Sequence, residues 1–202
     1  MKKRWMTAKE LMDKLNADPE FVASRAKKEA ELQERVAEYR RAEAPLVKEL
    51  RAARFQVESA WDLVNTPGSY PSAIPILLAH LPRPYPAAVR EGIARALAVP
   101  ETKAMGWDLL VQLYREEPEK RVKDGIAVAL AEAADDEVIG EVISLVRDAR
   151  HGACRGLLLS ALERSADPRA RATLMELGTD PDLTKEIQVI LKRLARRKRP
   201  RR

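Results

Sequence analysis

The side chains that could perform catalysis or bind a metal ion are few and scattered in this sequence. Its histidines are His80 and His151, its one cysteine is Cys154, and Asp135 and Asp136 form an adjacent acidic pair. A tetrahedral metal site needs three or four nitrogen, sulfur or carboxylate ligands at short spacings, which these residues do not provide. Adjacent acids ahead of an apolar run are typical of a helix cap, where they stabilise the positive end of the helix. We therefore predict no metal ligand among them.

Cys154 precedes Arg155, and a neighbouring cation can lower the pKa of a thiol. Its place within a predicted helix favours a half-buried structural cysteine instead. The glycines are isolated within helical segments, so there is no phosphate-binding loop, and no Gly-x-Ser-x-Gly nucleophile elbow occurs. The sequence thus predicts a protein that is not an enzyme, with no catalytic or cofactor-binding residue. The single cysteine and the lack of an apolar run of membrane-spanning length indicate a cytoplasmic protein.

The elements before residue 66 are expected to form a helical arm. Thr7 has capping-box spacing to Glu10, which predicts a short helix over 7–16. The Asp-Pro pair at 18–19 suits the cap and first turn of a longer helix, expected over 19–42. Its apolar positions make only a thin stripe, so one side is expected to pack while the rest is solvated.

A proline and a turn then set the end of this arm. Pro45 is expected to interrupt the long helix, and a short helix follows over 58–65. The run NTPGS at 65–69 is the clearest turn signal in the chain. We therefore predict that the arm covers 1–66 and that a second domain begins near residue 70.

The second part of the chain contains an internal repeat. Four helical segments align with one another: 89–97 (VREGIARAL), 122–130 (VKDGIAVAL), 153–162 (ACRGLLLSAL) and 183–191 (LTKEIQVIL). Their anchor residues Gly92, Gly125, Gly156 and Glu186 are 33, 31 and 30 residues apart. Between them lie other helical stretches, at 72–81, 103–115, 136–148 and 168–177. One such helical hairpin cannot bury its own apolar face, but a stack of hairpins can.

The helix at 89–97, its copy at 122–130 and the Asp-Pro-Arg-Ala run at 167–170 resemble HEAT repeats. They are most similar to the short bacterial type also called phycobilisome-lyase HEAT-like repeats, over residues 70–195. The resemblance implies an all-α fold: a right-handed α-solenoid of about four HEAT-like helix pairs, with the N-terminal arm ahead of it. Glycine at the anchors, where the family usually has alanine, implies close approach of helices. The fold carries no function with it, because solenoids serve many.

The free side of the repeat helices is predicted from their helical spacing. At 100° per residue Val89, Ile93 and Leu97 fall together on the core side, as do Val122 and its equivalents. In HEAT-like stacks the second helices line the concave surface, so the resemblance implies a stripe that contacts a partner protein. The alternative is that the aliphatic members of this stripe pack between repeats. The predicted stripe consists of Glu91, Arg95, Asp124, Val128, Arg155, Leu159, Lys185 and Val189.

Basic residues are concentrated at the ends of the chain. The chain carries a net charge of +6, yet 192–202 hold eight Lys or Arg and 1–4 hold three more, so residues 5–191 are at −5. A basic C-terminal tail is predicted over 196–202, and nucleic-acid phosphate is the alternative partner it would bind, without sequence specificity. A solvated tail that aids solubility is the other interpretation. The candidate phosphate-binding residues are Arg196, Arg197, Lys198, Arg199, Arg201 and Arg202.

Three functions remain in competition. The leading prediction is a scaffold or adaptor that binds another protein through the predicted stripe, with no membrane partner. The second is a nucleic-acid- or ribosome-associated factor that uses the tail. The third is a HEAT-like DNA glycosylase, suggested by Trp61-Asp62 and Trp107-Asp108. The groove of such an enzyme must contact DNA phosphates, and the net negative charge of residues 5–191 disfavours that contact. Bilin attachment, known from lyases with this repeat type, does not follow from the repeat alone.

Overall fold

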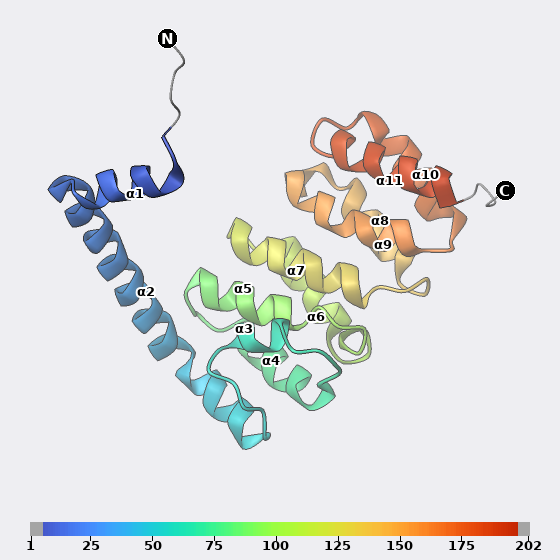
Figure 1. Ribbon diagram of the computed structural model, residues 1–202. Coiled ribbons are helices and arrows are strands. Elements are labelled where there is room, and N and C mark those ends of the chain that lie inside the picture. The colour runs from blue at the N-terminus through green and yellow to red at the C-terminus, as the bar shows by residue number, and fades with distance from the viewer. Residues whose placement is uncertain (1–5, 198–202) are drawn as a thin grey trace, which may run out of the picture. The chain divides into compact units, whose positions relative to one another are not determined.

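The computed structural model describes residues 6–197, and these residues are all-helical (Figure 1). They contain eleven α-helices, three 3-10 segments and no β-strand, which confirms the predicted all-α class. None of the described helices is long and apolar enough to cross a membrane. The elements are α1 (Ala8–Asn16), α2 (Pro19–Ala52), α3 (Ala60–Val64), η1 (Pro71–Ala73), α4 (Ile74–His80), α5 (Ala87–Ala96), α6 (Thr102–Glu116), α7 (Lys120–Ala133), α8 (Ile139–Arg147), η2 (Ala149–Leu158), α9 (Leu159–Arg164), α10 (Pro168–Glu176), η3 (Leu177–Thr179) and α11 (Thr184–Arg197).

The chain forms two compact units, one that extends to Arg41 and one that starts at Ala42. This division differs from the arm predicted over 1–66. The physical reason is burial: Leu46 and Leu50 are fully buried. The carboxylate of Glu43 also accepts hydrogen bonds from the hydroxyl of Ser59 (3.1 Å) and the backbone amide of Ala60 (3.3 Å), at the start of α3. The end of α2 and helix α3 therefore belong to the second unit.

The first unit consists of α1 and the N-terminal part of α2. Thr7 and Glu10 form the predicted capping box at the start of α1, and none of the residues of α1 is buried. Asp18 accepts hydrogen bonds from the backbone amides of Glu20 and Phe21, which satisfies donors at the start of α2. The helix capped in this way begins at Pro19, as the sequence predicted.

The predicted interruption of the long helix at Pro45 is wrong, because α2 continues through this residue to Ala52. Proline lacks a backbone N–H, so the carbonyl of Arg41 receives no bond from it. Burial of Leu46, Val47 and Leu50 directly after the proline stabilises the helix beyond the missing bond.

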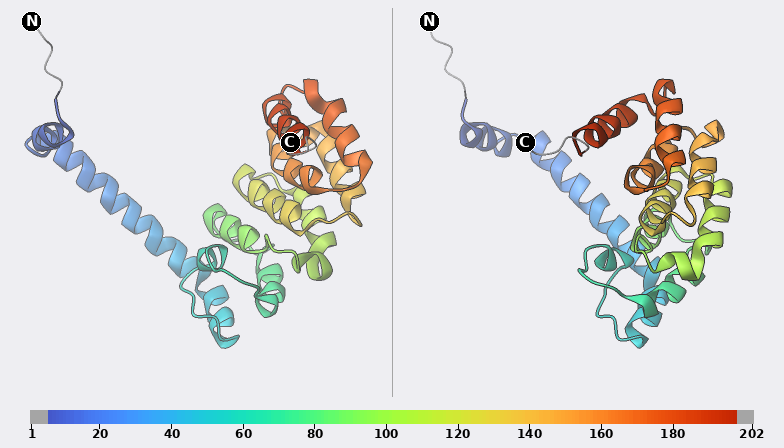
Figure 2. Two further views of the ribbon diagram at one scale, coloured as in Figure 1. Left: turned by 45° about the vertical axis from the view of Figure 1, so that its right-hand side comes forward. Right: turned by 90° about the vertical axis from the view of Figure 1, so that its right-hand side faces the viewer.

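Helices of the second unit alternate between two rows. Helix α3 contacts α5, α5 contacts α7, α7 contacts both η2 and α9, and α9 contacts α11. In the other row α4 contacts α6, and α8 contacts α10. Figures 1 and 2 show these hairpins following one another in chain order within the second unit. Each element therefore packs against elements one repeat away along the chain.

The predicted core faces are confirmed. Val89, Ile93 and Leu97 of the first repeat segment are at most 2% exposed, and so are Ile126 and Leu130 of the second. Polar contacts also link successive helix pairs. The side-chain hydrogen bonds and ion pairs between different helix pairs join residues 25 to 34 positions apart. This separation corresponds to about one repeat, so neighbouring pairs supply both the apolar and the polar stabilisation.

The third repeat departs from the predicted pattern. An α-helix was expected over 153–162, but 149–158 form the 3-10 segment η2, and α-helical structure starts at Leu159. Gly152 lies inside this segment with φ +56° and ψ −145°, a conformation that cannot continue a right-handed helix. A 3-10 segment turns about 120° per residue rather than 100°, so it directs its side chains differently from the other repeats.

Candidate partner-binding groove

The structure divides the predicted stripe into buried and accessible residues. Glu91, Arg155 and Leu159 are buried, which contradicts their prediction as surface residues. Arg95, Asp124 and Val128 are partly exposed, and Lys185 and Val189 are exposed. The stripe therefore does not form one continuous surface along the second helices. Its C-terminal part, formed by Leu159, Lys185 and Val189, lines a groove.

Arg155 is an interior residue, with 1% of its surface exposed. Its guanidinium donates hydrogen bonds to the carbonyl oxygens of Val146 (3.1 Å) and Gly152 (2.9 Å). It also donates to the carboxylates of Asp180 (3.0 Å) and Asp182 (3.3 Å) in the following repeat. The helical-wheel assignment failed here because Arg155 lies in η2, where the 3-10 geometry turns it inward. Its charge joins two helix pairs and is not available to a partner.

Glu91 has a similar structural role between α5 and α7. One carboxylate oxygen accepts from Arg95 at 2.8 Å, one turn along α5, and the other accepts from Arg121 at the start of α7. Next to it, Lys120 pairs with Asp124 at 2.5 Å. The Glu91–Arg121 pair joins α5 and α7, and the Lys120–Asp124 pair lies within α7. The charges at this interface therefore neutralise one another.

Helices α9 and α11 border an open groove with a volume of about 380 Å³. Leu159 and Ile190 are almost fully buried and form its apolar floor. Val189 is 53% exposed and forms an apolar wall. Gly156 lines the end of the groove without a side chain, and an added Cβ would make only an ordinary contact with Leu183, at 3.8 Å. Among the aliphatic residues of the predicted stripe, Val189 is exposed, Val128 is partly exposed and Leu159 is buried.

The rim of this groove, which we call the α9–α11 groove, is polar and carries both signs of charge. Arg193 of α11 pairs with Glu163 of α9 at 3.1 Å. Lys185 and Glu186 stand on α11 and are exposed, and Ser160 of α9 donates to the carbonyl of Leu157. Of the residues that line the groove, the sequence predicted Leu159, Lys185 and Val189. It did not indicate Glu163, Ile190 and Arg193. Helical spacing could have found the last of these, because Arg193 follows Val189 by one turn.

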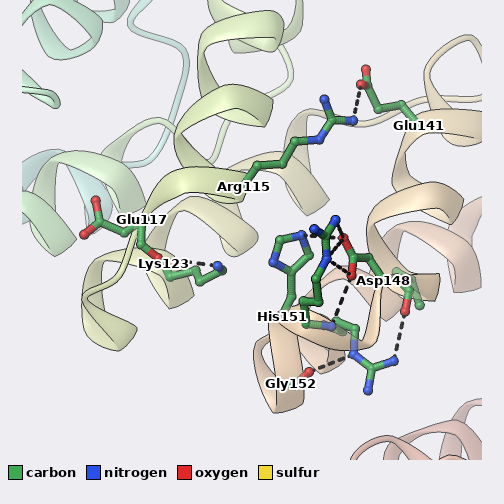
Figure 3. Close-up of polar contacts among 10 residues, drawn as sticks. Arg115, Glu117, Lys123, Glu141, Asp148, His151 and Gly152 are labelled. Carbon is green, nitrogen blue, oxygen red and sulfur yellow. Dashed lines mark hydrogen bonds and ion pairs between the residues drawn. The ribbon is translucent and has the colours of Figure 1, made fainter.

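A cluster of chemically versatile side chains lies elsewhere, between α6, α7 and η2, and Figure 3 shows its members Lys123, Asp148 and His151. The ring of His151 packs against that of Tyr114 with centroids 4.7 Å apart, and its Nε2 lies 3.6 Å from the carboxylate of Asp148. The ammonium of Lys123 lies 5.1 Å from the centre of the Tyr114 ring, where it makes a cation–π contact. Cys154 is buried nearby and bonds to Asp124.

The electrostatics of this cluster oppose nucleophilic chemistry. Burial and the hydrogen bond to Asp124 raise the pKa of the Cys154 thiol, which disfavours the reactive thiolate. Burial and the charge of Lys123 lower the pKa of His151, so the imidazole stays neutral. Burial also raises the pKa of the Tyr114 hydroxyl. The groups are therefore held in their uncharged forms, as expected of packed interior side chains.

The remaining candidates from the sequence lie apart from one another. His80 is fully buried, with its Nδ1 2.7 Å from the hydroxyl of Tyr85 and its Nε2 3.1 Å from a carboxylate oxygen of Glu49. The indole of Trp61 donates to the carbonyl of Ala88 (3.3 Å), and that of Trp107 donates to Glu141 (2.9 Å). Each tryptophan thus fills space between neighbouring helix pairs.

Of the acidic partners of these tryptophans, Asp62 has a structural role, as does the predicted acid pair, whereas Asp108 is exposed on α6. Asp62 caps α3, where it accepts from the backbone amides of Glu58 and Ser59. Asp135 accepts from the ammonium of Lys103 and from the amide of Glu137. Asp136 accepts from the hydroxyl of Ser165, on the next repeat. No group of three or more metal-binding side chains occurs among residues 6–197.

The predicted tail lies mostly outside the described residues, which end at Arg197. Lys192, Arg193 and Arg196 are exposed on the last turns of α11. Lys198, Arg199, Arg201 and Arg202 lie beyond the described part of the chain.

No protein-family model, characterised protein or solved structure matches this chain.

Proposed function

We propose that residues 42–197 form a HEAT-like, right-handed α-solenoid with four helix pairs and a shorter pair ahead of them. The alternation of two helix rows and the contacts between successive pairs support this fold. Glycine anchors add support: a Cβ on Gly92 would lie 2.7 Å from the indole of Trp61, and one on Gly125 would lie 3.0 Å from Ala94. The shorter pair, formed by the end of α2 and by α3, was not apparent in the sequence repeat.

We further propose that the protein is a non-enzymatic scaffold that binds another protein in the α9–α11 groove. The observation that carries this proposal is the exposure of Val189 above the apolar floor formed by Leu159 and Ile190. An accessible aliphatic residue over an apolar floor with a polar rim fits an apolar side chain of a partner. The mixed charges of Lys185, Glu186 and the Glu163–Arg193 pair suit a protein better than a polyphosphate.

The chemistry of the buried cluster favours binding over catalysis. The pKa of Cys154 is raised and that of His151 is lowered, both mainly by burial, so neither is prepared for nucleophilic or acid–base work near neutral pH. The single, buried cysteine also suits a reducing cytoplasm, where we place the protein.

Site-specific photo-cross-linking tests the groove. A photoreactive phenylalanine analogue replaces Val189 in one variant and Met175, which is 64% exposed on α10, in a control. After irradiation in native lysate with and without nuclease, we expect a defined protein adduct from position 189 that survives nuclease and is missing from position 175.

A second step links that adduct to the groove. The cross-linked protein is purified and its affinity is measured for the wild type, for Val189→Asp and for the matched surface variant Met175→Asp. Only Val189→Asp should weaken binding, because it places a charge over the apolar floor. Equal affinity for wild type and Val189→Asp, or no protein adduct at position 189, would refute the proposal.

Binding of nucleic acid is the second candidate function. It is favoured by the exposure of Lys192 and Arg196 on α11, at the start of the eight-cation run over 192–202. Phosphate binding of this kind is strongly salt-dependent and tolerant of sequence.

A further inference from the structure

The first unit exposes an apolar stripe along α2. Val22, Leu32 and Val36 are 37%, 48% and 41% exposed, and Tyr39 is partly exposed. Their spacing follows a heptad in which Val22 and Val36 occupy a positions and Leu32 and Tyr39 occupy d positions. A stripe restricted to a and d is narrow, and it is the seam of a coiled coil rather than the broad face of a core helix. We call these four residues the α2 seam.

The charged residues at the e and g positions that flank the α2 seam are all basic. Lys28 and Arg35 occupy consecutive g positions on one flank, and Arg40 occupies an e position on the other. Four acidic residues turn away from the seam: at 100° per residue they fall on the opposite side of the helix, which also carries Lys27 and Arg41, whereas Glu29 lies in the seam itself. These acids are Glu20, Glu31, Glu34 and Glu38, and all four are exposed. The surface around the seam is therefore apolar in the centre and basic at its edges.

We propose that the α2 seam binds a helix of another protein, in a two-stranded coiled coil, and that this partner helix carries acidic residues beside its own apolar seam. Basic flanks select acidic flanks, since opposite charges at e and g positions set partner choice in coiled coils. This surface lies in the first unit and is separate from the α9–α11 groove, so the protein has two binding surfaces.

Two charged residues take a and d positions between Val22 and Leu32, and they set the register in which a partner helix can pair with α2. Arg25 takes a d position and Glu29 takes an a position, one turn apart. A partner meets these two charges only when its own acidic and basic residues stand opposite them, and polar residues at single core positions specify register at some cost in stability. Arg25 is held in place by a hydrogen bond to the side chain of Asn16 at 3.2 Å.

Charge and seam width disfavour the other occupants. A second copy of α2 would bring Arg35 of one chain against Arg40 of the other in a parallel pair, and like charges at these positions repel. A membrane surface suits a broad apolar face, whereas this seam is narrow and Glu29 interrupts it.

Designed peptides provide the test with the full-length protein. All three peptides are about four heptads long and carry one Glu and one Lys opposite Arg25 and Glu29. At the other a and d positions the first has Leu with Glu at e and g, the second has Leu with Lys at e and g, and the third has Ser with Glu at e and g. We expect only the first to bind. The double variant Leu32→Ser/Val36→Ser should weaken that binding by about tenfold or more, while Met175→Ser, which removes an exposed apolar side chain elsewhere, should not.

A charge reversal tests specificity. The variant Lys28→Glu/Arg35→Glu should transfer preference from the Glu-flanked peptide to the Lys-flanked one, with the helical content by circular dichroism unchanged. Equal binding of the Ser-seam peptide would overturn the proposal, because charge alone would then explain the affinity. Dimerisation of the free protein that Leu32→Ser/Val36→Ser abolishes would overturn it in favour of a second copy, and seam-dependent binding to vesicles containing phosphatidylserine would do so in favour of a membrane.

Discussion

Replacing Gly125 with alanine tests how tightly α5 and α7 pack. A Cβ at this position would lie 3.0 Å from the Cβ of Ala94 and 3.2 Å from the carbonyl oxygen of Glu91. Both neighbours are backbone or one bond from it, so neither can turn away as a long side chain would. The two helices must separate by a few tenths of an ångström, or the methyl group must remain in a strained contact.

Two opposing effects set the magnitude. Alanine is favoured over glycine within a helix by about 1 kcal/mol. Forcing an extra carbon into a packed interface costs about 1–3 kcal/mol. Because Gly125 lies in the middle of α7 and is buried, both effects apply in full. We expect the overpacking to prevail and Gly125→Ala to lower the free energy of unfolding by about 1 kcal/mol.

Gly140→Ala is the matched control. Gly140 is an exposed residue of α8, where the nearest atom to an added Cβ is Arg169 Nη1 at 3.7 Å, an ordinary contact. Only the helix-propensity effect applies, so this variant should be stabilised by up to about 1 kcal/mol. Urea denaturation followed by circular dichroism measures both variants. A stabilisation of Gly125→Ala equal to that of Gly140→Ala would show that α5 and α7 are not in the contact described.

Three further predictions concern the core, the buried arginine and the tail. Leu130→Ala should cost about 2–5 kcal/mol in urea unfolding through cavity formation; a loss below about 1 kcal/mol would contradict its full burial. The hydrogen bond from Arg155 lowers the pKa of Asp180 in the folded protein. The ionised carboxylate therefore stabilises the fold at pH values above its unfolded pKa of about 3.9. This stabilisation is lost as the pH falls through the lower pKa of the folded state. Asp180→Asn should therefore cost about 1–3 kcal/mol at pH 7, with the difference from wild type narrowing below about pH 4; a pH-independent difference would refute this linkage. Deleting 196–202 should abolish retention on an RNA or heparin column at moderate salt if the tail binds phosphate, and unchanged retention would exclude that role.

The repeat helices could be predicted because their signals are local and redundant. Val89, Ile93 and Leu97 recur at helical spacing in a copy one repeat later, and turn residues such as Asp167-Pro168 mark where the next helix starts. Because the same pattern occurs in several repeat helices, a helix with a weak pattern can be predicted from the equivalent positions in the other repeats.

The third repeat escaped prediction because its backbone depends on one glycine. Gly152 adopts a positive φ that no periodicity reports, and it lies inside the 3-10 segment Ala149–Leu158. Arg155 is buried, as is its equivalent Glu91, whereas Asp124 at the same place in the repeat stays partly exposed. Gly156 accordingly meets no close neighbour, unlike Gly92 and Gly125, which are packed as the glycine pattern implied.

Contacts between neighbouring helix pairs determine how far the effect of a partner in the α9–α11 groove should extend. Polar contacts between helix pairs of the second unit span 25 to 34 residues, about one repeat. In such an arrangement each pair depends mainly on its neighbours, so damage or ligand binding acts over short distances. A partner in the α9–α11 groove should therefore protect α9, α10 and α11 from amide hydrogen exchange while leaving α5 nearly unchanged. Uniform protection over the second unit would mean that its pairs act as one cooperative block, and the nearest-neighbour account of this fold would be refuted.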